Sequence, residues 1–253
     1  MYVDPNLPRH LHGWQSPQLG LEMPIASYGD RGPPLLLFPR GPGDSLEAER
    51  CWLIKSIEPL LLAGRCRVFC VDSINRHAWQ CPTVSPAEAA RRHALYASYV
   101  EDEVVPYIRR LLHDPHARVT AAGAEFGAFH AANQLFRRPD LFDALVGMSG
   151  VYDLEPEHTR GHFDENVYFN NPVSYLANLH DPRTLERLRR ETRIYLVSGK
   201  GEGEAPERQA QLAALLTAME IPHELDLWGA DVERSWTWWG RMLNHALTAK
   251  LGW

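Results

Sequence analysis

Five residues near the middle of the chain, Gly123-Ala-Glu-Phe-Gly127, have the types and spacing to do chemistry. An apolar run from Val119 precedes them, and a helix-forming run to Asn133 follows. Glycines on both sides of a central residue form the frame of a nucleophile elbow, G-x-S-x-G, whose strained strand-to-helix turn projects one side chain over the strand ends. The central residue here is Glu125. The frame indicates an enzyme site, and close packing of a turn rich in glycine and alanine explains it equally well.

The elements around this turn alternate between strands and helices. Short apolar runs predict buried strands at 35–38, 67–71, 144–148, 194–197 and 223–228. Helical spacing and helix-start signals predict helices over 46–62, 85–112, 183–190, 207–219 and 237–251. After a polar opening segment, residues 20–28 are expected to form an edge strand, where Pro24 is tolerated. The alternation predicts an α/β fold with a mostly parallel central sheet and helices on both faces.

Length and charge limit the class of protein. A chain of 253 residues fits one large α/β domain, and a net charge of -6 makes nucleic acid and anionic membranes unexpected partners. The first residues lack the pattern of a secretion signal, and no stretch approaches the ~20 apolar residues of a membrane span, so we expect a cytoplasmic protein. The four cysteines have irregular spacing and are expected to be reduced. A homodimer is compatible with such a domain.

Residues 152–181 form a long segment rich in aromatic residues, asparagine and histidine. We expect an excursion above the sheet, because such long connections often cover a pocket. His158 and His162 have the spacing of two ligands on one helix face, but no glutamate lies between them, and we expect neither a metal nor a cofactor.

Together these segments resemble the putative esterases of the α/β-hydrolase superfamily, related to esterase D-like proteins. The resemblance covers nearly the whole chain and predicts a single α/β-hydrolase domain over residues 1–253. It rests on the elbow and on these segments: 16–20 leading to 28–29, 37–39, 71–73 with Trp79, 139–142, 148–153, and 227–229 through Trp239.

The resemblance implies a serine at the elbow, a histidine after the last strand and an acid after the preceding strand. Glu125 stands at the serine position. The family pattern Asp-Val-x-His-Asp-Trp corresponds to residues 231–236, which places Arg234 at the histidine position. The acid position falls at Glu204, with Glu202 as the other choice.

Two further sets of residues are assigned to the site, one by the hydrolase hypothesis and one by the binding hypothesis. Backbone N–H groups of Phe126 and of the Arg40–Gly41 loop would stabilise negative charge on a reacting oxygen. Tyr152 and Trp236 would line the pocket, although the tryptophans of 236–239 suit helix packing equally well.

These substitutions decide the expected chemistry. A serine nucleophile needs a base in the range of imidazole, whereas arginine stays protonated. Loss of nucleophile or base costs on the order of 10⁴–10⁶ in rate. We therefore expect a non-catalytic esterase-like protein that binds a small molecule or a protein partner. The alternative is a carboxylic-ester hydrolase that uses Glu125 as nucleophile or base; His245 is expected to pack in the terminal helix rather than to serve it.

The substitutions also predict a contact. Glu125 and Arg234 replace two groups that would have been hydrogen-bonded to each other, so they are expected to form an ion pair. With Glu204 behind Arg234, the predicted cluster is Glu-Arg-Glu at the floor of the pocket.

Overall fold

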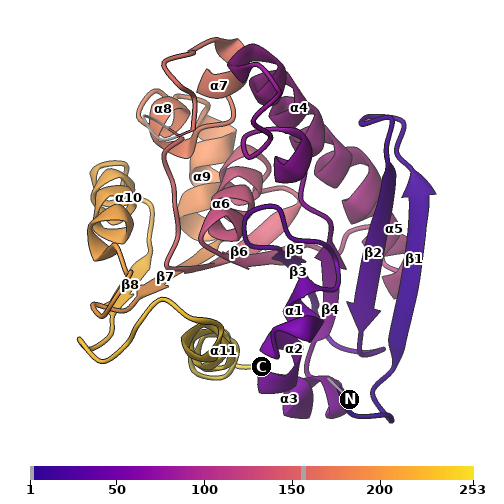
Figure 1. The fold of residues 1–253 in the computed structure, drawn as a ribbon. Helices are drawn as coiled ribbons and strands as arrows, with labels where there is room; N and C mark the ends of the chain where they lie inside the picture. The colour runs from indigo at the N-terminus through magenta and orange to yellow at the C-terminus, as the bar shows by residue number, and fades with distance from the viewer. Residues whose placement is uncertain (1–2, 155–157) are drawn as a thin grey trace.

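The computed structural model describes residues 3–154 and 158–253, and these contain one eight-stranded sheet (Figure 1). The strand order is β1-β2-β4-β3-β5-β6-β7-β8, with β1 and β2 antiparallel to their neighbours and all later pairs parallel. The strands are β1 (Arg9–Gln15), β2 (Glu22–Tyr28), β3 (Pro34–Phe38), β4 (Arg67–Val71), β5 (Val119–Ala124), β6 (Phe142–Met148), β7 (Arg193–Ser198) and β8 (Glu224–Leu227). The predicted mostly parallel α/β sheet is confirmed.

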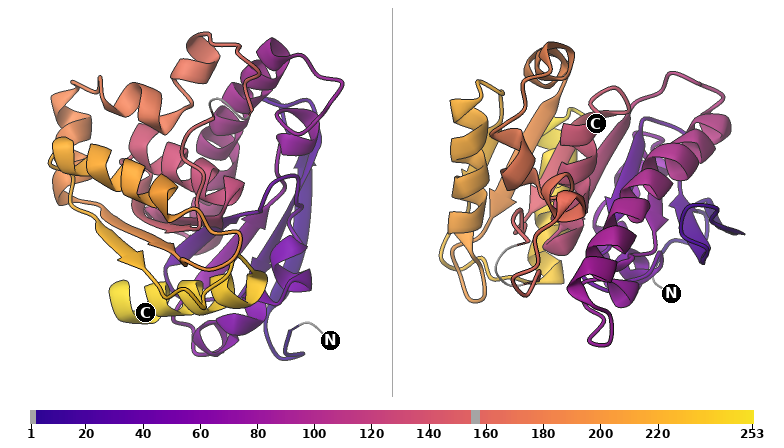
Figure 2. Two further views of the ribbon diagram at one scale, coloured as in Figure 1. Left: turned by 60° about the vertical axis from the view of Figure 1, so that its left-hand side comes forward. Right: turned by 90° about the horizontal axis from the view of Figure 1, so that it is seen from above.

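Helices cover both faces of this sheet (Figures 1 and 2). One layer contains α1 (Glu47–Arg50), α2 (Leu53–Ser56), α3 (Glu58–Leu62) and α11 (Trp236–His245). The other contains α4 (Pro86–Tyr99), α5 (Val105–Leu112), α6 (Phe126–Arg137), α9 (Pro182–Arg190) and α10 (Pro206–Ala218). Successive residues of β3 alternate between the two cores: Leu35 and Leu37 face α11, and Leu36 and Phe38 face α6. Burial on both faces explains why the central strands are continuous apolar runs.

Two expectations for the first third of the chain were wrong. The polar opening segment forms β1, whose residues are almost all exposed, so β1 rather than β2 is the edge of the sheet. Pro24 is still tolerated in β2, because it lies opposite Gly13 of β1 and the pairing with β4 begins only at Ile25. The helix predicted over 46–62 is divided into α1, α2 and α3, with Trp52 in the left-handed conformation at φ 63° between the first two.

The long helix predicted over 85–112 is present, with one irregularity. Ser85 caps it by accepting a hydrogen bond from the Glu88 N–H at 3.2 Å. A π-helical segment, Val100–Val104, joins α4 to α5, and Pro106 follows in the first turn of α5. Because proline lacks an N–H and crowds the preceding turn, a wider turn at this place allows the helix to continue.

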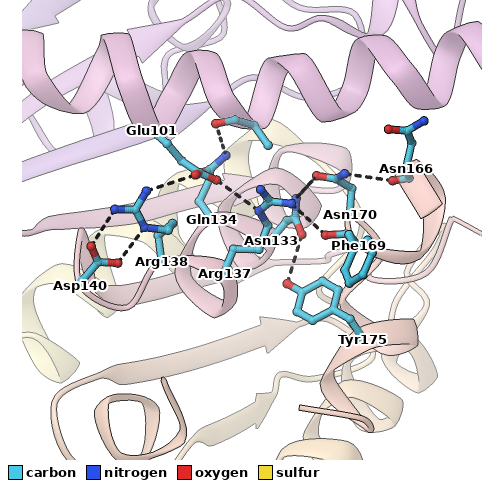
Figure 3. Close-up of polar contacts among 11 residues, drawn as sticks. Glu101, Asn133, Gln134, Arg137, Arg138, Asp140, Asn166, Phe169, Asn170 and Tyr175 are labelled. Atoms are coloured by element: carbon cyan, nitrogen blue, oxygen red, sulfur yellow. Dashed lines mark hydrogen bonds and ion pairs between the residues drawn. The ribbon is translucent and has the colours of Figure 1, made fainter. Parts of the chain in front are cut away.

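The excursion expected over 152–181 contains α7 (Glu165–Tyr168) and α8 (Pro172–Leu176); its residues 155–157 lie outside the described residues. A polar network joins it to α6 (Figure 3). Arg137 donates hydrogen bonds to the Phe169 carbonyl and to Asn170 Oδ1 at 3.0 and 3.1 Å, and the Tyr175 hydroxyl donates to Asn133 Oδ1 at 3.1 Å. The excursion is therefore anchored to the helix that begins at the elbow. Among the described residues, no helix has the length and apolarity needed to cross a membrane.

Candidate functional site

The elbow turn is built as its glycines predict. Glu125 lies between β5 and α6 with φ 50° and ψ −116°, a strained conformation for a residue with a side chain. A Cβ at Gly127 would lie 2.5 Å from the Phe38 carbonyl oxygen, and one at Gly123 would lie 2.3 Å from the carbonyl carbon of Gly127. Both glycines are thus required by close backbone contact, and Glu125 projects at the carboxyl ends of the central strands.

The predicted ion pair between Glu125 and Arg234 is present. Arg234 Nε lies 3.2 Å from Glu125 Oε1, and Arg40 Nε lies 3.1 Å from Glu125 Oε2. The Glu125 side chain is 17 % exposed, whereas both arginine side chains are 46 % exposed. The cluster is therefore Arg-Glu-Arg: one largely covered carboxylate lies between two half-exposed guanidinium groups.

Glu204 makes different contacts from those predicted. Its two carboxylate oxygens accept hydrogen bonds from Ser149 Oγ at 2.7 Å and Ser198 Oγ at 2.9 Å. Among the ion pairs of the described chain none joins Glu204 to Arg234, so the expected Glu-Arg-Glu cluster was wrong in its third member. Glu202, the other choice for the acid, is exposed, and its carbonyl oxygen accepts a hydrogen bond from the Arg234 N–H at 3.0 Å.

The backbone groups expected to stabilise negative charge differ in their availability. The Arg40 N–H donates to Glu47 Oε2 at 2.7 Å and is not free for a reacting oxygen in this conformation. Burial raises the pKa of the Glu47 carboxyl above its usual range. The Gly41 carbonyl accepts a hydrogen bond from Asn75. Phe126 is the first residue of α6, where helix geometry leaves its N–H without an acceptor within the helix.

Of the two aromatic residues predicted to line the pocket, Tyr152 is buried in the core and Trp236 borders a cavity at the site. Tyr152 is 2 % exposed and belongs to the core on the α6 side, so in this conformation it presents almost no surface to a ligand. Burial also raises the pKa of its hydroxyl. Trp236 is half-buried, and its ring packs edge-on against that of Trp239 at 5.0 Å. Trp236 and Arg40 border the same small cavity beside Ala124.

Trp239 connects the Arg-Glu-Arg cluster to Glu204. It is fully buried, its Nε1–H donates to Ser149 Oγ at 3.0 Å, and the Arg40 guanidinium lies over its ring at 5.9 Å. Ser149 in turn donates to Glu204. The sequence interpretation missed the roles of the Arg40 side chain and of the two serines; a basic residue in the loop after β3 was the only signal available.

Histidines lie behind and beside the elbow. His93 and His130 are buried, and their ring centroids are 5.1 Å apart. Burial lowers the pKa of His130 to about 3 and that of His93 well below its usual range. His158, from the excursion, packs against Phe126 at 5.0 Å. His245, in α11, packs against the rings of Trp228 and of Tyr195 in β7 at 5.8 and 6.3 Å, so it has the packing role that was expected.

Comparisons with known proteins agree with this arrangement. A solved ferulic acid esterase superposes with a TM-score of 0.74 at 16% identity, covering 95% of this chain and 96% of its own. An S-formylglutathione hydrolase from Agrobacterium tumefaciens gives 0.72 at 15% identity, covering 96% and 94% of the two chains. An S-formylglutathione hydrolase from Staphylococcus aureus gives 0.69 at 13% identity, covering 96% of each chain. These likenesses show the fold.

Sequence comparison identifies the family. A comparison with curated proteins found no significant match. The sequence profile described as Putative esterase matches residues 70–250, which include the elbow, the excursion and Arg234. The chain belongs to the putative esterase family of α/β-hydrolase-fold proteins.

Proposed function

We propose that this chain is an esterase-family protein that does not hydrolyse esters efficiently and instead binds a small molecule at the elbow. The observation that carries the proposal is the Arg-Glu-Arg cluster formed by Arg40, Glu125 and Arg234. A carboxylate held between two guanidinium groups has both oxygens engaged by cations and is a weak nucleophile. Neither guanidinium can accept the proton that a hydrolytic water must lose.

The strained elbow supports a functional rather than a purely structural turn. A non-glycine residue in a sparsely populated conformation costs of order 1–3 kcal/mol, and such residues cluster at active sites and ligand clamps. Glu125 has this conformation although glycine would adopt it without strain. The half-exposed Arg40 and Arg234 lie at the carboxyl ends of the strands, where open α/β sheets bind their ligands.

Hydrolysis with Glu125 as nucleophile or base is the second candidate. One observation favours it: His158 lies against Phe126, the residue next to Glu125. In that case His158 would activate water, in place of the histidine that the loop after β8 lacks.

Hydrolysis of p-nitrophenyl acetate by the purified chain tests the two candidates. We expect no turnover above that of free imidazole buffer, and no change with Glu125→Gln. Turnover that disappears in both Glu125→Gln and His158→Gln, with folding intact, would replace the binding function by a rebuilt hydrolase. Turnover lost in neither variant would indicate a contaminant rather than this site.

A further inference from the structure

The two arginines at the elbow have hydrogen-bonding capacity beyond their contact with Glu125. Nε is the guanidinium atom of each arginine that lies nearest the carboxylate, and no ion pair or side-chain hydrogen bond of either guanidinium with any other residue is found in the described chain. Each guanidinium carries five N–H donors, and one carboxylate can accept at most two of them in the bidentate geometry, so at least three donors of each arginine remain for a ligand. Because both side chains are 46 % exposed, these donors are open to a ligand at the surface of the site.

The charges at the cluster favour a ligand with one negative charge. Two guanidinium groups and one carboxylate leave one positive charge uncompensated. The other nearby acids, Glu47 and Glu204, accept hydrogen bonds from neutral groups, the Arg40 backbone N–H and two serine hydroxyl groups, and so keep their negative charges. A monoanion would balance the three-residue cluster, whereas the second negative charge of a dianion such as a phosphate monoester would face only repulsion from Glu47 and Glu204. A carboxylate also matches the planar fork of guanidinium.

An apolar surface lies beside the charged groups. Trp236 borders the small cavity that Arg40 also lines, and it borders a groove of about 790 Å³ between α2 and α11. Trp52, which is 54 % exposed, lies on the opposite wall of this groove. An indole next to a guanidinium pair suits a ligand that has a ring or hydrocarbon group attached to its anionic end.

We infer that the elbow site binds a small hydrophobic monocarboxylate. Its carboxylate lies across the Nη groups of Arg40 and Arg234, and its apolar group contacts Trp236 at the entrance of the groove. This inference rests on the proposed function, since a free carboxylate has no ester bond to cleave and is therefore bound rather than turned over. Glu125 then acts as an internal competitor for the same two arginines.

Calorimetric titration of the full chain with phenylacetate tests the inference. Phenylacetamide, its neutral isostere, should bind at least about tenfold more weakly, since a charge-assisted hydrogen bond contributes about 1.5–3 kcal/mol. Arg234→Gln and, separately, Arg40→Gln should each weaken phenylacetate by about tenfold and leave phenylacetamide unchanged. Glu125→Gln should strengthen phenylacetate, because it removes the internal competitor. Trp236→Ala should weaken phenylacetate more than acetate.

A second ion pair, next to the start of β5, supplies the controls. Arg118, just before β5, pairs with Glu191 at 2.7 Å at the opposite end of the sheet from the elbow. Arg118→Gln and Glu191→Gln should leave phenylacetate binding unchanged. The thermal midpoint of every variant is measured as a control for folding. Partial recovery of phenylacetate affinity by Arg234→Lys would show that loss of charge, rather than loss of folding, weakens binding in Arg234→Gln.

The outcomes separate this inference from the proposed function. Equal binding of phenylacetate and phenylacetamide, no effect of either arginine change, or weaker binding after Glu125→Gln would each overturn the carboxylate site. The proposal that the chain does not hydrolyse esters efficiently would still stand in that case. Conversely, turnover of p-nitrophenyl acetate that depends on Glu125 would overturn the binding function, whatever the affinity for phenylacetate.

Discussion

Restoring the family's nucleophile and base should recover only a small part of the rate of a complete triad. The change is Glu125→Ser combined with Arg234→His. In triad enzymes the whole triad contributes about 10⁶ to the rate, and loss of the acid alone costs about 10⁴. Glu204 is held by Ser149 and Ser198 rather than directed at position 234. The double variant should therefore exceed the wild-type rate by about 10², not 10⁶.

A third change separates the acid from the other two groups. Ser198→Ala removes one of the two hydrogen bonds that hold Glu204, while Ser149 keeps its bond from the buried Trp239. In the double variant this change should raise the rate by a further tenfold or so, because a freed carboxylate can orient the new imidazole. Adding Glu204→Gln should cancel that gain and should have no effect without Ser198→Ala.

Release of p-nitrophenolate from p-nitrophenyl acetate, followed by absorbance, measures these rates, and the thermal midpoint controls for folding. A double variant that reaches about 10⁶ would refute the reasoning, since Glu204 would then support the base despite its serine partners. A double variant with no gain would refute it in the other direction, because the elbow would not position a serine for attack.

Three further predictions concern stability. Gly127→Ala should destabilise the fold by about 3 kcal/mol through the contact with the Phe38 carbonyl, lowering the melting temperature by about 2–4 °C for each kcal/mol; an unchanged midpoint would contradict the crowding at the elbow. The side chain of Glu101 is 9 % exposed and pairs with Arg137 at 3.2 Å. Glu101→Gln should therefore lower the free energy of unfolding, measured with denaturant, by about 2 kcal/mol and should speed proteolysis in the excursion. His130 binds a proton in the unfolded chain below about pH 6.5 but in the folded chain only near pH 3, so stability should fall as the pH drops across that window. His130→Phe should flatten this dependence, and an unchanged pH profile would show that His130 is not responsible.

Much of the fold follows from local patterns. The apolar runs at β3 and β4 and the cap at Ser85 lie where hydrophobic periodicity and capping chemistry predict them, because these signals act between residues a few positions apart. The division of 46–62 into three helices was not predictable in this way. Trp52 has a left-handed backbone that no propensity favours for tryptophan, so the packing around it decides this break.

The edge strand β1 shows a second limit of local patterns. Its residues are polar and exposed, so no hydrophobic alternation marks it as a strand. Its strand conformation comes from pairing with β2, in register from Arg9 opposite Tyr28 to Gln15 opposite Glu22. Backbone hydrogen bonds between neighbouring segments supply that stabilisation, and a partner elsewhere in the chain is invisible to a short window of sequence.

The sequence by itself determined the strand-turn-helix at the elbow, because Gly123 and Gly127 are small enough for its close contacts, and it placed Glu125 and Arg234 together. Only the tertiary structure decided that Arg40 completes the cluster and that serines hold Glu204. These contacts join loops that meet at the carboxyl ends of different parallel strands. Which side chain reaches which partner there depends on strand order and rotamer, neither of which a linear pattern contains.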